Sequence, residues 1–374
     1  MKRIAYITVL ALMFLSIAAK AQDKGQERRM AVVNLSAIYM RQLPDYESAL
    51  ETQELMGTVV EIVGSKGYWR EIISPQPYRA WTTEMGLIEM NAEQLQEYED
   101  APKFMFTGLY GHVFSAPSAR SEIICDLVGG DILRSAKVGG RNTSQAGRTK
   151  ARLSNRNTSQ AGRMEARLSG RWTKVMLPSG KEGYVPTRNL KVHGGFISIA
   201  QTASRQGSIN ELSSEISENV IAEAMKYLGS PYMWGGMSSK GTDCSGLVRI
   251  CHLMNGVLLP RNASQQFNCG RQIPMEIDIR YWEDRFRTTE DGRHPDAFRK
   301  EMLQRISGLE RGDLIFFGSP STETAGRPRV THVGIYLGDG RMIHSSQMVR
   351  INSLIPGEPD YYENSHRLVG AVRL

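Results

Sequence analysis

The sequence of 374 residues has few cysteines and no long apolar run after its first 20 residues. Four cysteines allow at most two disulfides, a low number for a disulfide scaffold of this size. Without a later run of about 20 apolar residues, the body of the chain has no candidate for a membrane-spanning helix. The cysteines also lack Cys-x-x-Cys spacing, which argues against a compact structural zinc site.

One short apolar run does occur, at residues 4–19, after Met1, Lys2 and Arg3. It is followed by small residues up to Ala21 and then by polar ones, as in a cleaved secretory signal. We expect residues 1–21 to be removed near Ala21, leaving an exported protein, periplasmic or secreted, without stable membrane insertion. The alternative is a retained N-terminal anchor.

The net charge of +7 comes from one segment. Residues 141–171 hold eight basic residues and a single Glu, so the charge does not indicate a nucleic-acid partner. Within this segment, residues 141–155 (RNTSQAGRTKARLSN) are almost repeated by residues 156–170 (RNTSQAGRMEARLSG). Two copies poor in large apolar residues do not form a solenoid, and we expect a long surface loop. The alternative is a basic arm that contacts an anionic polymer.

A weaker repeat relates residues 57–87 to residues 130–190. Both copies contain short alternating strands separated by glycine turns, a pattern typical of small β-barrels. They resemble bacterial SH3-like domains, with recurring aromatics at Trp69 and Trp81 in one copy and at Trp172 and Tyr184 in the other. We predict SH3-like domains at residues 30–100 and 104–195, the second carrying the 141–170 loop, with these aromatics packed in the cores.

A polar linker, residues 196–215, precedes a third domain, residues 216–374. In this domain Cys244 begins a helix in which apolar residues recur at helical spacing. The unpaired N–H groups and the positive dipole at a helix N-terminus favour a thiolate. Cys244 is therefore the candidate nucleophile.

Three strands are predicted at residues 314–317, 331–337 and 341–346, the last two joined by a tight glycine turn. The alternation places His332 and His344 on one face of adjacent antiparallel strands. We predict a relay in which His332 takes the thiol proton and His344 orients its ring.

Four segments of the third domain together resemble the NlpC/P60 family of papain-like cysteine peptidases. They are Asp-Cys-Ser-Gly from Asp243, the run that begins at Arg311, Thr-His-Val-Gly from Thr331 and Ile-His-Ser-Ser from Ile343. The resemblance implies an α+β papain-like domain behind the two small all-β SH3-like barrels. It also implies a cysteine endopeptidase that cuts the bond between D-Glu and the diamino acid of peptidoglycan stem peptides, in cell-wall turnover or recycling.

The same resemblance implies a substrate with a free N-terminal L-Ala. The amine would be held by Asp243 together with an acidic residue and a Tyr from the barrels, for which we predict Glu84 and Tyr110. Four further residues would line the cleft: Tyr232, Trp234, Ser245 and Ser264. A carboxylate near the amine favours a free N-terminus, because a stem peptide that lacks the amine leaves the carboxylate unpaired.

Residues 270–308 stand where the family has a shorter connection, and we expect either a flap over the cleft or a surface elaboration. The partners expected are peptides derived from peptidoglycan, with no metal or organic cofactor, and the protein is expected to be a monomer. Three alternatives stay open: zinc binding by Cys244, His332 and His344, an amidase or acyltransferase on the same fold, and a wall-binding protein without catalytic activity.

Overall fold

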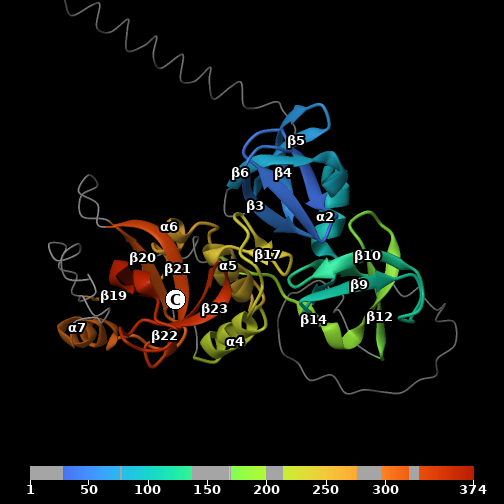
Figure 1. The fold of residues 1–374 in the computed structure, drawn as a ribbon. Coiled ribbons are helices and arrows are strands. Elements are labelled where there is room, and N and C mark those ends of the chain that lie inside the picture. The colour runs from blue at the N-terminus through green and yellow to red at the C-terminus, as the bar shows by residue number, and fades with distance from the viewer. Residues whose placement is uncertain are drawn as a thin grey trace, which may run out of the picture.

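The computed structural model describes residues 28–75, 78–136, 168, 170–198, 214–275, 296–319 and 328–374. The predicted signal segment 1–21, nearly all of the 141–170 repeat and most of the 196–215 linker lie outside these ranges. Within them, no helix has the length and apolar character needed to cross a bilayer. The chain is arranged as two N-terminal β domains beside a C-terminal domain (Figure 1).

Each N-terminal domain is built on one seven-stranded sheet. The first sheet contains β1 (Arg29–Val33), β2 (Ala37–Arg41), β3 (Leu50–Leu55), β4 (Val59–Lys66), β5 (Trp69–Ser74), β6 (Tyr78–Thr83) and β7 (Leu87–Met90). The second contains β8 (Lys103–Phe106), β9 (Tyr110–Phe114), β10 (Ile123–Val128), β11 (Ile132–Ser135), β12 (Trp172–Met176), β13 (Glu182–Pro186) and β14 (Leu190–His193). The strand orders, β3-β2-β6-β5-β4-β1-β7 and β10-β9-β13-β12-β11-β8-β14, are the same topology. The weak sequence repeat therefore corresponds to a structural repeat, and the prediction of two small all-β domains is confirmed.

The predicted core aromatics are buried to different extents. Trp69 is buried, whereas Trp81, Trp172 and Tyr184 are half-buried. Smaller aliphatic residues on alternate strand positions form most of the first core, and Phe104 and Phe106 anchor the second. The expectation of core packing is thus met in full by Trp69 alone. A helix, α2 (Ala92–Asp100), connects the two domains.

The C-terminal domain contains a six-stranded antiparallel sheet of order β19-β24-β20-β21-β22-β23. Its strands are β19 (Arg271–Ile273), β20 (Leu314–Ser319), β21 (Arg329–Gly338), β22 (Arg341–Ser346), β23 (Met348–Ser353) and β24 (Leu368–Arg373). The three predicted strands are confirmed as β20, β21 and β22. Asp339 and both flanking glycines of the β21–β22 turn have positive φ, which explains the glycines there.

Helices pack on both faces of this sheet. On one face lie α4 (Ser214–Met225), α5 (Cys244–Leu253) and α6 (Ala263–Gln266), with Leu314 and Phe316 of β20 pointing toward them. The other face carries Ile315 and Phe317 and is covered by α7 (Asp296–Ile306) (Figure 1). Since α7 belongs to the 270–308 segment, this part of it is a packed surface element rather than a flap. The α+β fold class predicted for this domain is confirmed.

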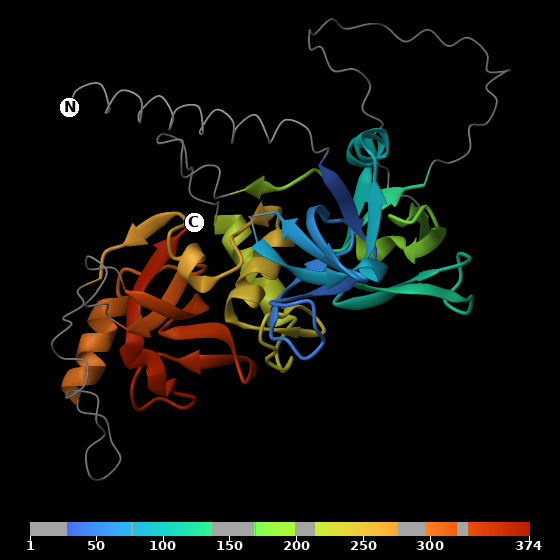
Figure 2. The same cartoon turned by 90° about the horizontal axis from the view of Figure 1, so that it is seen from above.

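The first β domain is joined to the C-terminal domain by polar contacts from strand β3. The side chain of Gln53 accepts a hydrogen bond from the backbone N–H of Met237 at 2.7 Å. Glu54 pairs with Arg249 of α5 at 3.5 Å, and both side chains are buried. Figure 2 shows the first domain lying directly beside the loops that precede α5. These contacts fix β3 against the part of the C-terminal domain that carries Cys244.

A buried histidine on α5 makes the stability of this domain depend on pH. The Nδ1–H of His252 donates to the carbonyl of Val248 at 2.7 Å, and burial lowers the pKa of His252 to about 4. Between pH 4 and 6.5 the unfolded chain binds a proton here that the folded chain does not, so stability is lost as pH falls through this window. The full contribution is on the order of 3 kcal/mol. Urea unfolding at pH 7 and pH 4.5 should show a smaller pH effect in His252→Gln, and an unchanged effect would contradict this account.

Candidate active site

Cys244 lies at the N-terminus of α5, as predicted. The N-cap is Asp243, whose Oδ1 accepts the backbone N–H of Gly246 at 2.7 Å. Burial and the nearby Asp243 carboxylate raise the pKa of the Cys244 thiol to about 11, and backbone N–H groups of Ser245 and Val333 lower it by less. Burial therefore outweighs the helix terminus, and the thiol is protonated at neutral pH. The expectation of a thiolate favoured by the helix is not met in the free site.

The two predicted histidines meet on neighbouring strands. His332 of β21 and His344 of β22 are joined by a hydrogen bond of 2.7 Å between Nε2 of the first and Nδ1 of the second. Gly334 makes room for this contact, because a Cβ at that position would lie 3.3 Å from the Cβ of His344. The Cys244 thiol lies near the backbone N–H of Val333, next to His332. The structure thus brings the three predicted catalytic residues into one region.

Both histidines are neutral at neutral pH. Burial and the neighbouring His344 lower the pKa of His332 to about 3, and burial and Arg350 lower the pKa of His344 to about 4 despite a hydrogen bond to Asn352. The ring of Tyr362 packs against both, with centroid distances of 5.9 Å to His332 and 4.9 Å to His344. A neutral imidazole beside a protonated thiol is a pair that can pass one proton.

The carboxylate of Asp243 is occupied by internal partners. Arg261 donates to it from both terminal nitrogens, at 2.6 Å and 3.0 Å, and the backbone N–H of Gly235 donates at 2.9 Å. The Nε of Arg261 donates to the hydroxyl of Thr52 on β3 of the first domain at 2.7 Å. Asp243 and Arg261 are both buried. A strand from another domain therefore completes the shell that holds the N-cap of α5.

The four predicted cleft residues differ in exposure. Tyr232 is half-buried near Cys244, and burial, Cys244 and Asp243 together raise the pKa of Tyr232 to about 12. Trp234 is 67% exposed, which leaves its ring available to a ligand. Ser245 is buried, with its hydroxyl 3.0 Å from Arg261, and Ser264 is exposed on α6. Of the four, Tyr232 is the one near Cys244, and Trp234 and Ser264 are exposed to solvent.

The two residues predicted from the β domains have different surroundings. Tyr110 is exposed at the start of β9, and the preceding carbonyl of Leu109 accepts a hydrogen bond from Ser239 of the C-terminal domain. Glu84 pairs with Arg70, inside the first β domain. On β3 of the same domain, the backbone of Leu50 and Glu51 lies against Gly235, the residue after Trp234, and the carboxylate of Glu51 accepts a hydrogen bond from the hydroxyl of Tyr78 at 2.6 Å.

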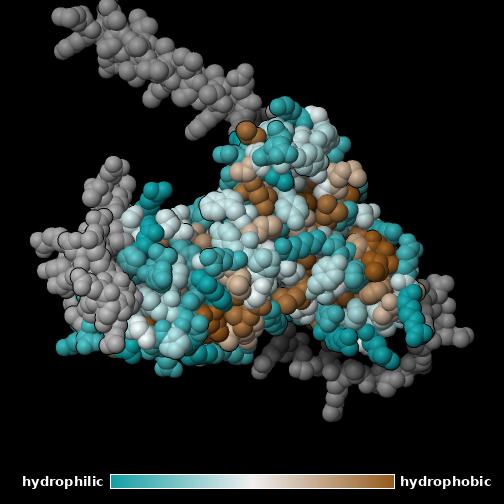
Figure 3. Space-filling view, in the orientation of Figure 1, coloured by the Kyte–Doolittle hydropathy of each residue, from teal (hydrophilic) through white to brown (hydrophobic). Residues whose placement is uncertain are grey.

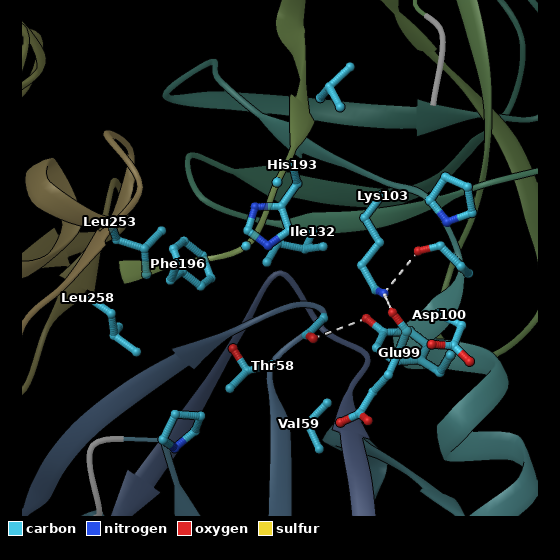
Figure 4. Close-up of a pocket in the computed structure, with 18 of the residues that line it drawn as sticks. Thr58, Val59, Glu99, Asp100, Lys103, Ile132, His193, Phe196, Leu253 and Leu258 are labelled. Atoms are coloured by element: carbon cyan, nitrogen blue, oxygen red, sulfur yellow. Dashed lines mark hydrogen bonds between the residues drawn. The ribbon is translucent and has the colours of Figure 1, made fainter. Parts of the chain in front are cut away.

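A cavity of about 520 Å³ lies at the junction of the three domains, away from these residues (Figure 4). Its walls include Thr58 and Val59 of the first domain, Lys103 and His193 of the second, and Leu253 of α5. None of the predicted site residues lines it.

On the face seen in Figure 3, hydrophobic residues form small separate patches.

The zinc alternative finds no support in the geometry. Across the ranges given above, no three His, Cys, Asp or Glu side chains are grouped as metal ligands. All four cysteines carry free thiols.

Several residues of the site carry no motif and were missed by sequence analysis. Arg261 lies three residues before Ser264, but nothing local indicates that its partner is Asp243. Thr52 lies in a different domain. Asn352 and Tyr362 lie after the last recognised motif in the chain and are not part of it. Only the tertiary structure places these side chains beside the histidines or the N-cap.

Comparison with known proteins identifies the domain that carries this site. Residues 229–366 match the NlpC/P60 family model. A gamma-D-glutamyl-L-lysine dipeptidyl-peptidase of Bacillus cereus is 29% identical over 191 residues, covering 51% of this chain and 43% of that protein. The bifunctional muramidase/DL-endopeptidase CwlT of Bacillus subtilis is 35% identical, covering 36% and 30%. The chain therefore spans less than half the length of these curated relatives.

Solved structures support the same fold. An NlpC/P60 family protein from Bacillus cereus superposes with a TM-score of 0.60 at 20% identity, covering 92% of this chain and 99% of that one. An NlpC/P60 endopeptidase from Photobacterium damselae has a TM-score of 0.53 at 14% identity, covering 87% and 66%. At these identities the likeness concerns the fold. Together with the family match, it shows that the chain carries an NlpC/P60 family domain in its C-terminal part.

Proposed function

We propose that this protein is an exported cysteine endopeptidase that hydrolyses the bond between γ-D-Glu and the diamino acid of peptidoglycan stem peptides. The observation that carries the proposal is the convergence of Cys244 at a helix N-terminus with the hydrogen-bonded pair His332–His344. Two relatives are named gamma-D-glutamyl-L-lysine dipeptidyl-peptidase, and their names support this choice of the cleaved bond. The N-terminal segment, with Lys2 and Arg3 before the apolar run 4–19 and small residues up to Ala21, supports export.

The reaction follows from the protonation states. As the sulfur of Cys244 attacks the carbonyl carbon, its proton passes to His332, and the carbonyl oxygen becomes an oxyanion near the N–H groups that begin α5. His332 then gives the proton to the leaving amine, which breaks the peptide bond and leaves a thioester. Water, deprotonated by His332, hydrolyses the thioester and restores the thiol. Cys244 and His344 are buried and His332 is half-buried, which limits the competition of bulk water for these protons.

We further propose that the substrate has a free N-terminal L-Ala amine. Since Arg261 already neutralises Asp243, an additional carboxylate is needed to attract an amine. We propose Glu51 for this role in place of Glu84, because the backbone of Glu51 lies against Gly235 beside Trp234, whereas the Glu84 carboxylate is already paired with Arg70. Tyr78 donates to Glu51 at 2.6 Å and fixes its side chain, and Tyr110 remains the predicted tyrosine of the second domain.

The proposal is tested by mass spectrometry on L-Ala-γ-D-Glu-diaminopimelate, its L-lysine counterpart and the N-acetylated form of each. We expect release of L-Ala-γ-D-Glu from the free-amine peptides and much slower cleavage of the acetylated ones. Glu51→Gln should reduce this preference about 10-fold or more, because a charge-assisted hydrogen bond is lost. Glu84→Gln is the matched control and should keep the preference.

Other outcomes would redirect the assignment. Equal cleavage of free and acetylated peptides would remove the amine subsite but keep the endopeptidase. Cleavage of another amide or transfer of an acyl group would indicate the amidase or acyltransferase alternative. If neither these peptides nor intact wall polymer were cleaved, the alternative of a wall-binding protein without catalytic activity would be favoured.

A further inference from the structure

The hydrogen bonds of the two histidines continue to a third side chain that no motif marks. Asn352 lies on β23, next to the strand of His344, and its Oδ1 is 2.8 Å from Nε2 of His344. The Nδ2 of Asn352 is 2.6 Å from the backbone carbonyl of Asp360. His344 and Asn352 are buried, so these contacts are shielded from bulk water.

The direction of each hydrogen bond follows from one fixed point. A backbone carbonyl can only accept, so the amide atom that faces Asp360 must be the NH₂ group and the atom that faces His344 must be the oxygen. Because an amide oxygen also only accepts, Nε2 of His344 must carry a hydrogen. His344 is neutral, so its Nδ1 has a lone pair and accepts from His332. Nε2 of His332 is then the protonated nitrogen, and its Nδ1 is the free base.

We propose that Asn352, oriented by the Asp360 carbonyl, is a positioning residue that sets the tautomers of both histidines and leaves Nδ1 of His332 unprotonated for the thiol of Cys244. Without this fixed acceptor, either histidine can hold its hydrogen on the other nitrogen. His332 would then present an N–H instead of a lone pair to the thiol for part of the time. The predicted tautomers do not depend on the proposed hydrolase function, whereas the predicted changes in kcat and KM rest on it.

Histidine-selective ¹⁵N NMR on the mature protein tests the tautomers directly. In the wild type we expect both residues to show a protonated Nε2 and an unprotonated Nδ1 at neutral pH. A protonated Nδ1 on His332 would overturn the proposal. The result stands even if no stem peptide is cleaved, so failure of this inference is distinguishable from failure of the proposed function.

Two variants separate tautomer control from packing. Asn352→Leu removes the acceptor at similar size, and we expect mixed tautomers and a 10- to 100-fold lower kcat with little change in KM. Asn352→Asp should retain the wild-type tautomers and a kcat within a few-fold while its carboxyl is protonated, because the O–H donates to the Asp360 carbonyl and the other oxygen accepts from Nε2 of His344. Once ionised, the carboxylate faces that carbonyl with a second acceptor, and the tautomers should be lost. Wild-type kcat and single tautomers in Asn352→Leu would overturn the proposal. If that variant does not fold, the wild-type spectrum and Asn352→Asp still decide it.

Discussion

Replacement of Cys244 by alanine is expected to lower hydrolysis of the free-amine stem tripeptide by more than about 10⁴-fold. No other thiol can substitute, because Cys251 and Cys269 are buried in the core beneath the helices and Cys125 is in the second β domain. Loss of a nucleophile in a relay of this kind costs as much as loss of the whole relay. The tripeptide assay with product detection by mass spectrometry measures this effect.

The matched control is Cys251→Ala, a change of the same residue type on the same helix. Cys251 is fully buried and burial raises its pKa well above the usual value, so it serves packing alone. We expect this variant to keep its kcat and to lose on the order of 1 kcal/mol of stability. Residual turnover in Cys244→Ala close to the wild-type rate would show that the nucleophile lies elsewhere.

Replacement of Arg261 by leucine is expected to destabilise the C-terminal domain strongly. It leaves the Asp243 carboxylate buried without its cation and leaves Thr52 without its donor. Breaking a buried ion pair from one side costs about 3–5 kcal/mol. The loss should appear in thermal and urea unfolding, and activity should fall with it because Asp243 is the N-cap of the helix that carries Cys244.

An exposed ion pair of nearly the same length provides the control. Arg311 pairs with Glu218 at 2.7 Å, compared with 2.6 Å for Arg261 and Asp243, but both side chains are about half exposed. Solvent screens such pairs, so Arg311→Leu should cost about 1 kcal/mol or less. If the two changes lowered the free energy of unfolding equally, burial of the Arg261–Asp243 pair would make no additional contribution to stability.

The candidate site was predictable wherever its signal is local. Cys244 begins a stretch with helical periodicity after a capping Asp, and His332 and His344 fall on alternating positions of strands joined by a glycine turn. The repeated glycines and aromatics likewise predicted two similar β domains, which the shared strand order confirms. These features depend on residues that are close together in the chain, so they are visible as periodic patterns in the sequence.

Other parts of the site depend on partners far apart in the chain. Arg261 meets Thr52 across 209 residues, and Asn352 reaches His344 only through the pairing of β22 with β23. The same holds for the protonation of Cys244: the sequence predicts the favourable effect of a helix terminus on the thiolate, but the larger opposing effect of burial depends on segments far apart in the chain.

The sequence by itself indicated the candidate nucleophile, the histidine pair and the resemblance to NlpC/P60 peptidases, because each of these signals lies within short segments of the chain. Only the tertiary structure decided that the backbone of Glu51 lies against Gly235, how Asp243 is neutralised and which acceptor faces Nε2 of His344. Those properties arise from desolvation and from hydrogen bonds between distant segments. Neither exists until the domains are packed together.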